Sequence, residues 1–230
     1  MATKMLANAF ERQRERDAAR RRAARAFATS VHSGDADATF AAFQVLTQSY
    51  SAGLWRMAMR AVAKAPCPSR ALRRRLLDMY VAWGDNLRQE VSDDLLLCDA
   101  LRMMLLPYAG PARVLYRGEI GENQRRRTYS LSWSQDIDVA RHFAQGITRT
   151  CIGGSVLLKT TAPPSAIICA PSNAADRYGE REFLVDRRRL HKVEVVERFS
   201  QISHAEYDEQ SRAHTRAILI ERGLGGDDDE

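Results

Sequence analysis

Two glutamates one residue apart, in the stretch GEREFLVD (179–186), have a type and spacing that suggest chemistry. Side chains alternate faces along a strand, so Glu180 and Glu182 are predicted to share one face, with Phe183 and Val185 on the other. A rise of roughly 3.3 Å per residue sets the two carboxylates about 6 to 7 Å apart. The pair fits either a cleft in which the carboxylates do different jobs or the solvated acidic face of an amphipathic strand.

An arginine and a glycine follow an apolar run in the stretch LYRG (115–118). Because of that run, Arg117 is expected to project from the end of a buried strand. A guanidinium there can bind a phosphate with two parallel hydrogen bonds, and Gly118 lets a ligand approach the backbone closely. The alternative is a strand-end arginine that is ion-paired at the surface.

Three serines alternate with apolar residues in the stretch YSLSWS (129–134). Ser130, Ser132 and Ser134 are predicted to form one hydroxyl-bearing face of a strand, which suits the wall of a polar cleft. An antiparallel strand with one wetted side produces the same alternation.

Helices are expected to dominate the first hundred residues, which are rich in the good helix formers Ala, Arg, Leu and Met. Gly and Pro occur there mainly at the expected ends of helices. Ser69 and Ser92 are predicted helix caps. The predicted helices cover about 5–30, 37–64 with a break near 51–53, 69–89 and 92–106.

Short strands and turns are expected to dominate the rest of the chain. The strand candidates are VLYRG, YSLSWS, GSVLLKTT, SAIICA, EREFLVD and HKVEVVERF. DIDVARHFAQ predicts one amphipathic helix, capped by Asp136, that buries Val139, Ala140 and Phe143 on one stripe. A final helix over about 204–222 begins at SHAE, a capping-box pattern.

The order of these motifs resembles the arginine-serine-glutamate class of mono-ADP-ribosyltransferases. The matching parts are YRG (116–118), SWS (132–134) running into VARHFA, and the E-x-E motif ERE (180–182). The resemblance covers about residues 111–199. Trp133 stands where the family usually has threonine, and we expect this to change packing and not chemistry, because Trp133 would point away from the serines.

The resemblance implies an α+β fold in which an N-terminal helical region precedes the catalytic core. That core is expected to be ADP-ribosyltransferase-like, with two packed, mainly antiparallel β-sheets. The predicted segments are a helical region at 1–108, the catalytic core at 109–202, and a C-terminal helix with an acidic tail at 203–230.

Members of this family cleave the nicotinamide glycosidic bond of NAD and transfer ADP-ribose to an acceptor. The resemblance implies catalytic roles for Arg117, Ser132, Glu180 and Glu182, with NAD as the substrate and no metal. Glu182 would stabilise an oxocarbenium-like transition state. Ser132 would orient Glu182 or the ribose, and Arg117 would neutralise the pyrophosphate.

Further positions are implied to bind NAD or the acceptor. The backbone of Gly118 would hold the nicotinamide amide, and Ser134 would contribute to the NAD site. Phe143 would either line the nicotinamide pocket or, as its helical spacing favours, pack in the core. Glu180 would align an acceptor guanidinium and help to remove its proton, because an unperturbed guanidinium, with a pKa above about 12, is a weak nucleophile. Tyr178 would help to recognise the target.

The leading prediction is therefore a glycosyltransferase-class enzyme that modifies arginine side chains of a target protein. Two variants keep the fold and change the acceptor: transfer to a nucleic acid, and hydrolysis of NAD. A non-enzyme alternative is a basic helical binding protein with accidental motifs.

The charge distribution leaves a nucleic-acid partner open. The net charge is +6, and residues 1–110 hold 17 basic and 11 acidic side chains, so the whole excess lies there. Much of it is in ERQRERDAARRRAAR (11–25), which can bind nucleic acid or an acidic surface. Its three acids favour an exposed helix face, and the arginine triplets at 125–127 and 187–189 are expected in solvated turns.

The cysteines, the histidines and the hydropathy of the chain give no indication of a metal site, a redox motif or a membrane span. The four cysteines show no C-x-x-C spacing and the five histidines no metal-ligand spacing. No apolar run approaches the roughly 20 residues that span a bilayer, and the N-terminus lacks a signal-peptide core. We therefore expect a cytoplasmic location, in its own cell or in a host entered by a phage or toxin effector, and no membrane partner.

Overall fold

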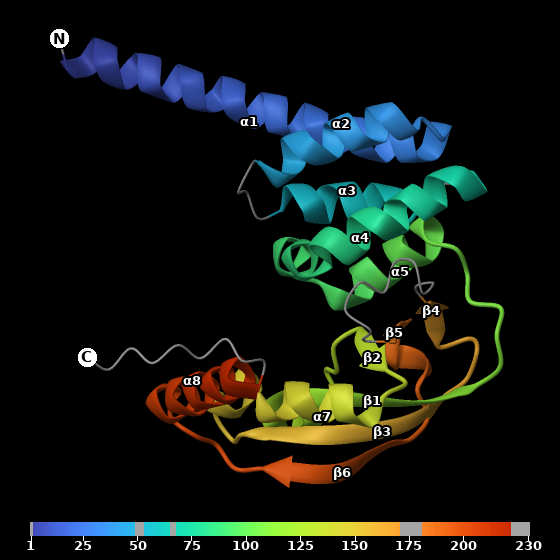
Figure 1. Cartoon of the computed structure of the whole chain (residues 1–230). Helices are drawn as coiled ribbons and strands as arrows, with labels where there is room; N and C mark the ends of the chain where they lie inside the picture. Colours follow the sequence, from blue (N-terminus) through green and yellow to red (C-terminus); the bar gives the residue numbers. More distant parts are fainter. Residues whose placement is uncertain (1, 49–52, 65–67, 171–180, 222–230) are drawn as a thin grey trace. The chain divides into compact units, whose positions relative to one another are not determined.

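The computed structural model describes residues 2–48, 53–64, 68–170 and 181–221 (Figure 1). The chain divides into two compact units, each built from two stretches of sequence. The first unit comprises Met1–Pro111 and Pro164–Asp186, and the second comprises Ala112–Pro163 and Arg187–Glu230. The division at residue 111 lies close to the predicted end of the helical region at 108, whereas residues 164–186, predicted in the catalytic core, join the helical unit.

Five helices in the described residues form most of the first unit. They are α1 (Ala2–Ser33), α2 (Ala36–Thr47), α3 (Leu54–Val62), α4 (Arg70–Val91) and α5 (Asp94–Met104). All of the predicted helices are present. The predicted break falls between α2 and α3, where Gly53 begins α3 from a left-handed conformation with φ of 103°.

Side-chain caps fix where these helices begin. The Ser69 hydroxyl accepts a hydrogen bond from the Leu72 N–H at 3.3 Å, as predicted. Ser92 is not the cap of α5, because the Asp93 carboxylate takes that role and accepts from the Leu96 N–H at 3.1 Å. Ser92 instead ends α4 with φ of 52°. Asp and Ser cap helices about equally well, so the sequence alone did not separate the two positions.

An aromatic cluster forms the centre of the helical core. The Trp55 side chain is only 2% exposed. Its ring centroid lies 5.3 Å from that of Phe27, 5.5 Å from that of Phe43 and 5.2 Å from that of Trp83. These rings come from α1, α2, α3 and α4, so one cluster ties four helices together.

Two short antiparallel strands complete the first unit: β4 (Ile167–Cys169) and β5 (Glu182–Val185). The Phe183 ring packs against Tyr108 with a centroid separation of 6.0 Å. Asp186, at the end of β5, is fully buried and pairs with Arg102 of α5 at 3.3 Å. The β4–β5 pair is thus attached to α5 by charge and to the segment after α5 by packing.

The second unit contains four strands, which are β1 (Arg113–Ile120), β2 (Ser132–Ser134), β3 (Ser155–Ala162) and β6 (Val193–Phe199). β1 and β3 pair antiparallel along their whole lengths, and β6 pairs antiparallel with β3. β2 meets β1 at the single pair Tyr116–Ser134. The long predicted strand YSLSWS is therefore reduced to its last three residues.

Helices of the second unit are α6 (Gly121–Arg126), α7 (Ile137–Gln145) and α8 (His204–Glu221), with 3-10 turns at Ile147–Thr150 and Arg187–Arg189. α7 lies along β1 and β3 (Figure 1). The predicted caps of α7 and α8 are confirmed: Asp136 accepts from the Asp138 N–H at 2.9 Å, and Ser203 and Glu206 cap each other reciprocally.

Helix α6 was not predicted. It places two residues of the first arginine triplet in a helix, where Arg125 and Arg126 each lie 2.6 Å from the Glu122 carboxylate. Pairs at these spacings support a short helix at the surface.

All six described strands join in one antiparallel sheet, in the order β4-β5-β2-β1-β3-β6. The resemblance implied two packed sheets, and these strands do not separate in that way. The reason lies in β1 and β3, which pair with each other and each take another strand on the remaining edge. The α+β organisation, with helices first and strands after them, is confirmed.

The aromatic cluster generates a stability prediction. Replacing Trp55 by Ala should lower the free energy of unfolding by about 3 to 5 kcal/mol, because it leaves a cavity among three rings. Urea unfolding followed by circular dichroism measures the change. Phe40→Ala, at a side chain that is 44% exposed, is the matched control and should cost less than about 1 kcal/mol. Equal losses for the two variants would contradict the assigned core.

Candidate functional site

Arg117 lies in β1 with its guanidinium held at two points. Its Nε donates to Glu119 Oε2 at 2.8 Å, and its Nη1 donates to the Ser132 carbonyl oxygen. Among the described residues, Nη2 has no hydrogen-bond partner. The side chain is 17% exposed, so this is an oriented, half-buried guanidinium and not a mobile surface arginine. The predicted ion-paired alternative is therefore partly right, because the partner is a neighbour on the same strand.

Glu119 is the residue that the motifs did not indicate. It stands two positions after Arg117, so the two side chains share one face of β1. Burial alone would raise the pKa of Glu119, but the positive charge of Arg117 and hydrogen bonds from Arg117, Ser130 and Asn123 outweigh it and lower that pKa. The carboxylate is thus ionised at neutral pH, although only 3% of it is exposed. The i, i+2 spacing of opposite charges in a strand was the available signal.

The two serines of β2 have different surroundings. The Ser134 hydroxyl is buried and accepts a hydrogen bond from the Asp136 N–H at 2.9 Å. Because Asp136 caps α7, Ser134 helps to build the turn from β2 into that helix. Ser132 is partly exposed, and its carbonyl oxygen is the group that Arg117 contacts.

Strand register explains why Arg117 meets the backbone of Ser132. Residues directly opposite in an antiparallel pair share a face, so Ser134 lies on the face of Tyr116, which packs against α7. Ser132, two residues before Ser134, follows the same face by alternation, whereas Arg117 lies on the other. The two predicted residues are therefore adjacent through a backbone carbonyl, and the Ser132 hydroxyl makes no hydrogen bond to Arg117.

Gly118 is a glycine because α7 comes very close to β1. A Cβ at this position would lie 2.3 Å from the Ala144 nitrogen and 2.6 Å from the Ala140 oxygen. Real Cβ atoms do not tolerate such contacts with backbone, so helix packing accounts for the residue type without a ligand. The predicted contact with nicotinamide remains a prediction.

Phe143 is 51% exposed, so the favoured sequence interpretation, core packing, is wrong. The buried stripe of α7 consists of Ala140 and Ala144, and Val139 is only partly buried. Small side chains are needed there because the helix approaches Gly118 so closely. Phe143 is left at the surface and remains available for a ligand.

Glu182 is the first residue of β5 and is partly exposed. Arg181, directly before it, has φ of 46°, which is left-handed and not extended. The described strand therefore opens at Glu182, and the shared direction of the Glu180 and Glu182 carboxylates stays a prediction. Glu180 and Tyr178 lie outside the described residues.

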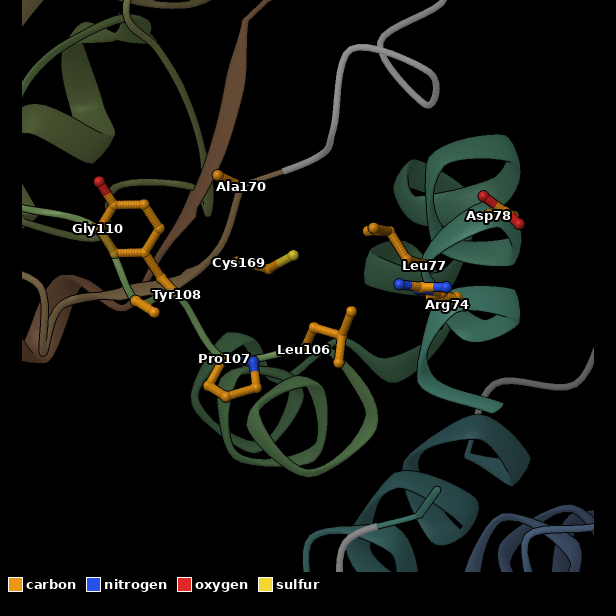
Figure 2. Close-up of a pocket in the computed structure, with 10 residues that line it drawn as sticks. Arg74, Leu77, Asp78, Leu106, Pro107, Tyr108, Gly110, Cys169 and Ala170 are labelled. Atoms are coloured by element: carbon orange, nitrogen blue, oxygen red, sulfur yellow. The ribbon is translucent and has the colours of Figure 1, made fainter. Parts of the chain in front are cut away.

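A pocket of about 660 Å³ lies in the first unit, close to β4 (Figure 2). Figure 2 shows the Cys169 thiol pointing into the space that Leu77 of α4 bounds from the other side. Its size falls within the range of small-molecule sites. The lining residues are Arg74, Leu77, Asp78, Leu106, Pro107, Tyr108, Ala109, Gly110, Cys169 and Ala170.

Cys169 in β4 lies opposite Leu184 of β5, which is two residues after Glu182. Burial and, after it, the negative charge of Glu182 raise the pKa of the Cys169 thiol to about 11. The thiol is therefore protonated at neutral pH and is a poor nucleophile. Glu182 is not among the residues that line this pocket.

Two kinds of site are not found in the described parts of the chain. No group of three or more His, Cys, Asp or Glu residues there could hold a metal ion. No helix among those residues is long and apolar enough to cross a membrane.

The structure assigns the predicted site residues to both units. Arg117, Gly118, Ser132, Ser134 and Phe143 belong to the second unit. Glu182 belongs to the first. No family model, curated protein or solved structure matches this chain.

The close approach of α7 generates the prediction for this site. Gly118→Ala should destabilise the protein by about 1 to 3 kcal/mol, because the added methyl group must push α7 away from β1. Gly146→Ala is the matched control, since a Cβ there would meet only carbonyl oxygens at 3.4 and 3.5 Å. Urea unfolding of both variants gives the comparison. A Gly118→Ala protein as stable as the control would contradict the packing described here.

Proposed function

We propose that this protein is an NAD-dependent mono-ADP-ribosyltransferase that modifies arginine side chains of a target protein. The observation that carries the proposal is the arrangement of Arg117. Its guanidinium is half-buried, held by Glu119 and the Ser132 carbonyl, and has Nη2 without a hydrogen-bond partner among the described residues. An arginine held in this way suits a phosphate group, because its charge is fixed in direction before the ligand arrives.

The order of motifs supplies the rest of the support. YRG lies in β1, SWS forms β2 and leads through Asp136 into α7, and Glu182 opens β5. The helix that follows SWS has the context that the resemblance to ADP-ribosyltransferases expects, whereas Arg117 lies within β1 and not at its end, and β5 opens at Glu182. The proposal predicts that Arg117, Ser132 and Glu182 bind one and the same NAD molecule.

The reaction follows from the chemistry of the glycosidic bond. The bond between ribose C1′ and the nicotinamide nitrogen breaks, and nicotinamide leaves with the bonding electron pair. Positive charge develops on the ribose, and the Glu182 carboxylate stabilises it. A guanidinium nitrogen of the acceptor then attacks C1′ and loses a proton, for which Glu180 is the proposed base.

A protein acceptor is preferred to a nucleic acid because of how the arginines outside the site are used. Arg125 and Arg126 pair with Glu122, and Arg187 donates to the Tyr129 carbonyl oxygen at 3.0 Å. These three arginines have partners within the second unit, whereas the exposed basic run of α1 keeps a nucleic-acid acceptor as the second candidate. The setting we propose is a cytoplasm, of its own or of a host cell, where NAD and target proteins are both present.

Glu182→Gln tests the proposal directly. It should reduce ADP-ribose transfer and NAD hydrolysis by about 100-fold or more, because the fixed negative charge beside the ribose is lost. Mass spectrometry of cell extract incubated with the protein and NAD identifies the modified molecule and residue. Glu194→Gln, at an exposed residue that pairs with Lys192, is the control and should keep full activity.

Several outcomes would overturn the proposal. Wild-type protein that consumes no NAD would favour the binding-protein alternative. A protease-resistant label on nucleic acid would move the acceptor to the second candidate. A folded Glu182→Gln variant with full activity would remove Glu182 from the reaction.

Glu180→Gln separates acceptor activation from bond cleavage. We expect transfer to arginine to fall by about 100-fold, because the proposed base is removed, while NAD hydrolysis persists. Radiolabelled NAD assays with and without acceptor protein measure the two activities side by side. Equal losses of both activities would contradict the assignment of Glu180 to the acceptor.

A further inference from the structure

The Glu119 carboxylate accepts four hydrogen bonds beside Arg117. Its Oε2 accepts from Arg117 Nε at 2.8 Å and from the Ser130 N–H at 2.9 Å. Its Oε1 accepts from Asn123 Nδ2 at 2.9 Å and from the Ile120 N–H at 3.1 Å. A buried charge that is fully paired in this way has one orientation.

Because Glu119 has one orientation, it also fixes the orientation of the Arg117 guanidinium that it contacts. An arginine side chain has many rotamers, and ordering it on ligand binding costs conformational entropy. Glu119 fixes Nε and the Ser132 carbonyl fixes Nη1, so the direction of Nη2 is set before a ligand binds. The negative charge of Glu119 weakens the attraction of Arg117 for an anion, so the gain from Glu119 must come from geometry.

Glu119 also organises the connection between β1 and β2. Its contacts reach Ile120 at the start of this connection, Asn123 in α6 and Ser130 close to its end. Asn123 continues the network, because its side-chain oxygen accepts from the Thr128 hydroxyl at 3.2 Å. One carboxylate therefore sets both the guanidinium of Arg117 and the path of the chain that leads to Ser132.

We infer that Glu119 is a positioning residue that orients Arg117 toward a phosphate of the dinucleotide substrate. The inference rests on the proposed function, because it names a pyrophosphate as the group that Arg117 binds. Glu119 itself contacts no substrate. Its effect on NAD affinity must pass through the guanidinium, and this separates positioning from a role in folding alone.

A double-mutant cycle tests this separation. Glu119→Gln should weaken NAD binding, measured as a Kd by isothermal titration calorimetry, by about tenfold or more, as loss of an orienting partner does elsewhere. In an Arg117→Lys background, where the fork that Glu119 holds is absent, the same change should weaken binding by no more than about twofold. Glu122→Gln, at a partly exposed glutamate of α6, is the matched control and should leave the Kd unchanged.

Circular dichroism melts establish whether each variant is folded. If Glu119→Gln does not fold, Glu119→Asp, which keeps the charge and shortens the side chain, replaces it in the same cycle. Folded variants with wild-type affinity, or equal losses in both backgrounds, would overturn the inference. Failure of both variants to fold would assign Glu119 to folding alone and overturn it too. Wild-type protein that does not bind NAD would instead remove the proposed function itself.

Discussion

A charge pair inside one strand, Arg117 with Glu119, is the interaction on which the candidate site depends. The two side chains share a face of β1, and their opposite charges stabilise each other where water has little access. Removing one partner of such a pair typically costs about 3 to 5 kcal/mol, because the other charge is left buried. The pKa of Glu119 lies below its usual 4.5, so its ionised form stabilises the fold above that pH. The stabilisation is lost as the pH falls through the lowered value.

The other face of β1, away from Arg117, is determined by the close packing of α7 against the strand. Gly118, Ala140 and Ala144 allow the helix to lie against the strand with no room for a methyl group. Ser134 and Asp136 then build the turn that carries the chain from β2 into this helix. β1 thus has a charged face with Arg117 and a packed face with Gly118, because successive side chains of a strand point to opposite faces.

Much of the fold could be predicted from local patterns. Helix-forming composition and cap residues such as Ser69 and Asp136 gave the helices and several of their ends, because both signals act within one or two turns. The strands were also found, although β2 is shorter than its alternating pattern indicated. Strand order depends on pairing between distant segments, which local patterns do not contain, and the predicted two sheets are one sheet in the structure.

The site was predicted less well, for reasons that are equally physical. Phe143 has helical spacing that fits a buried stripe, but the tight approach at Gly118 admits only alanines. The pattern predicted a strand from Glu180, but the left-handed conformation of Arg181 keeps that residue out of β5, which begins at Glu182. Glu119 belongs to no motif, and its importance comes from four hydrogen-bond donors that folding gathers around it.

Determination of a crystal structure with NAD bound tests the central claim most directly. The account predicts a pyrophosphate oxygen within hydrogen-bonding distance of Arg117 Nη2 and the nicotinamide ribose beside the Glu182 carboxylate. The Glu119 side chain should keep its hydrogen bonds and make no contact with the dinucleotide. Well-ordered NAD that touches neither Arg117 nor Glu182 would contradict the account.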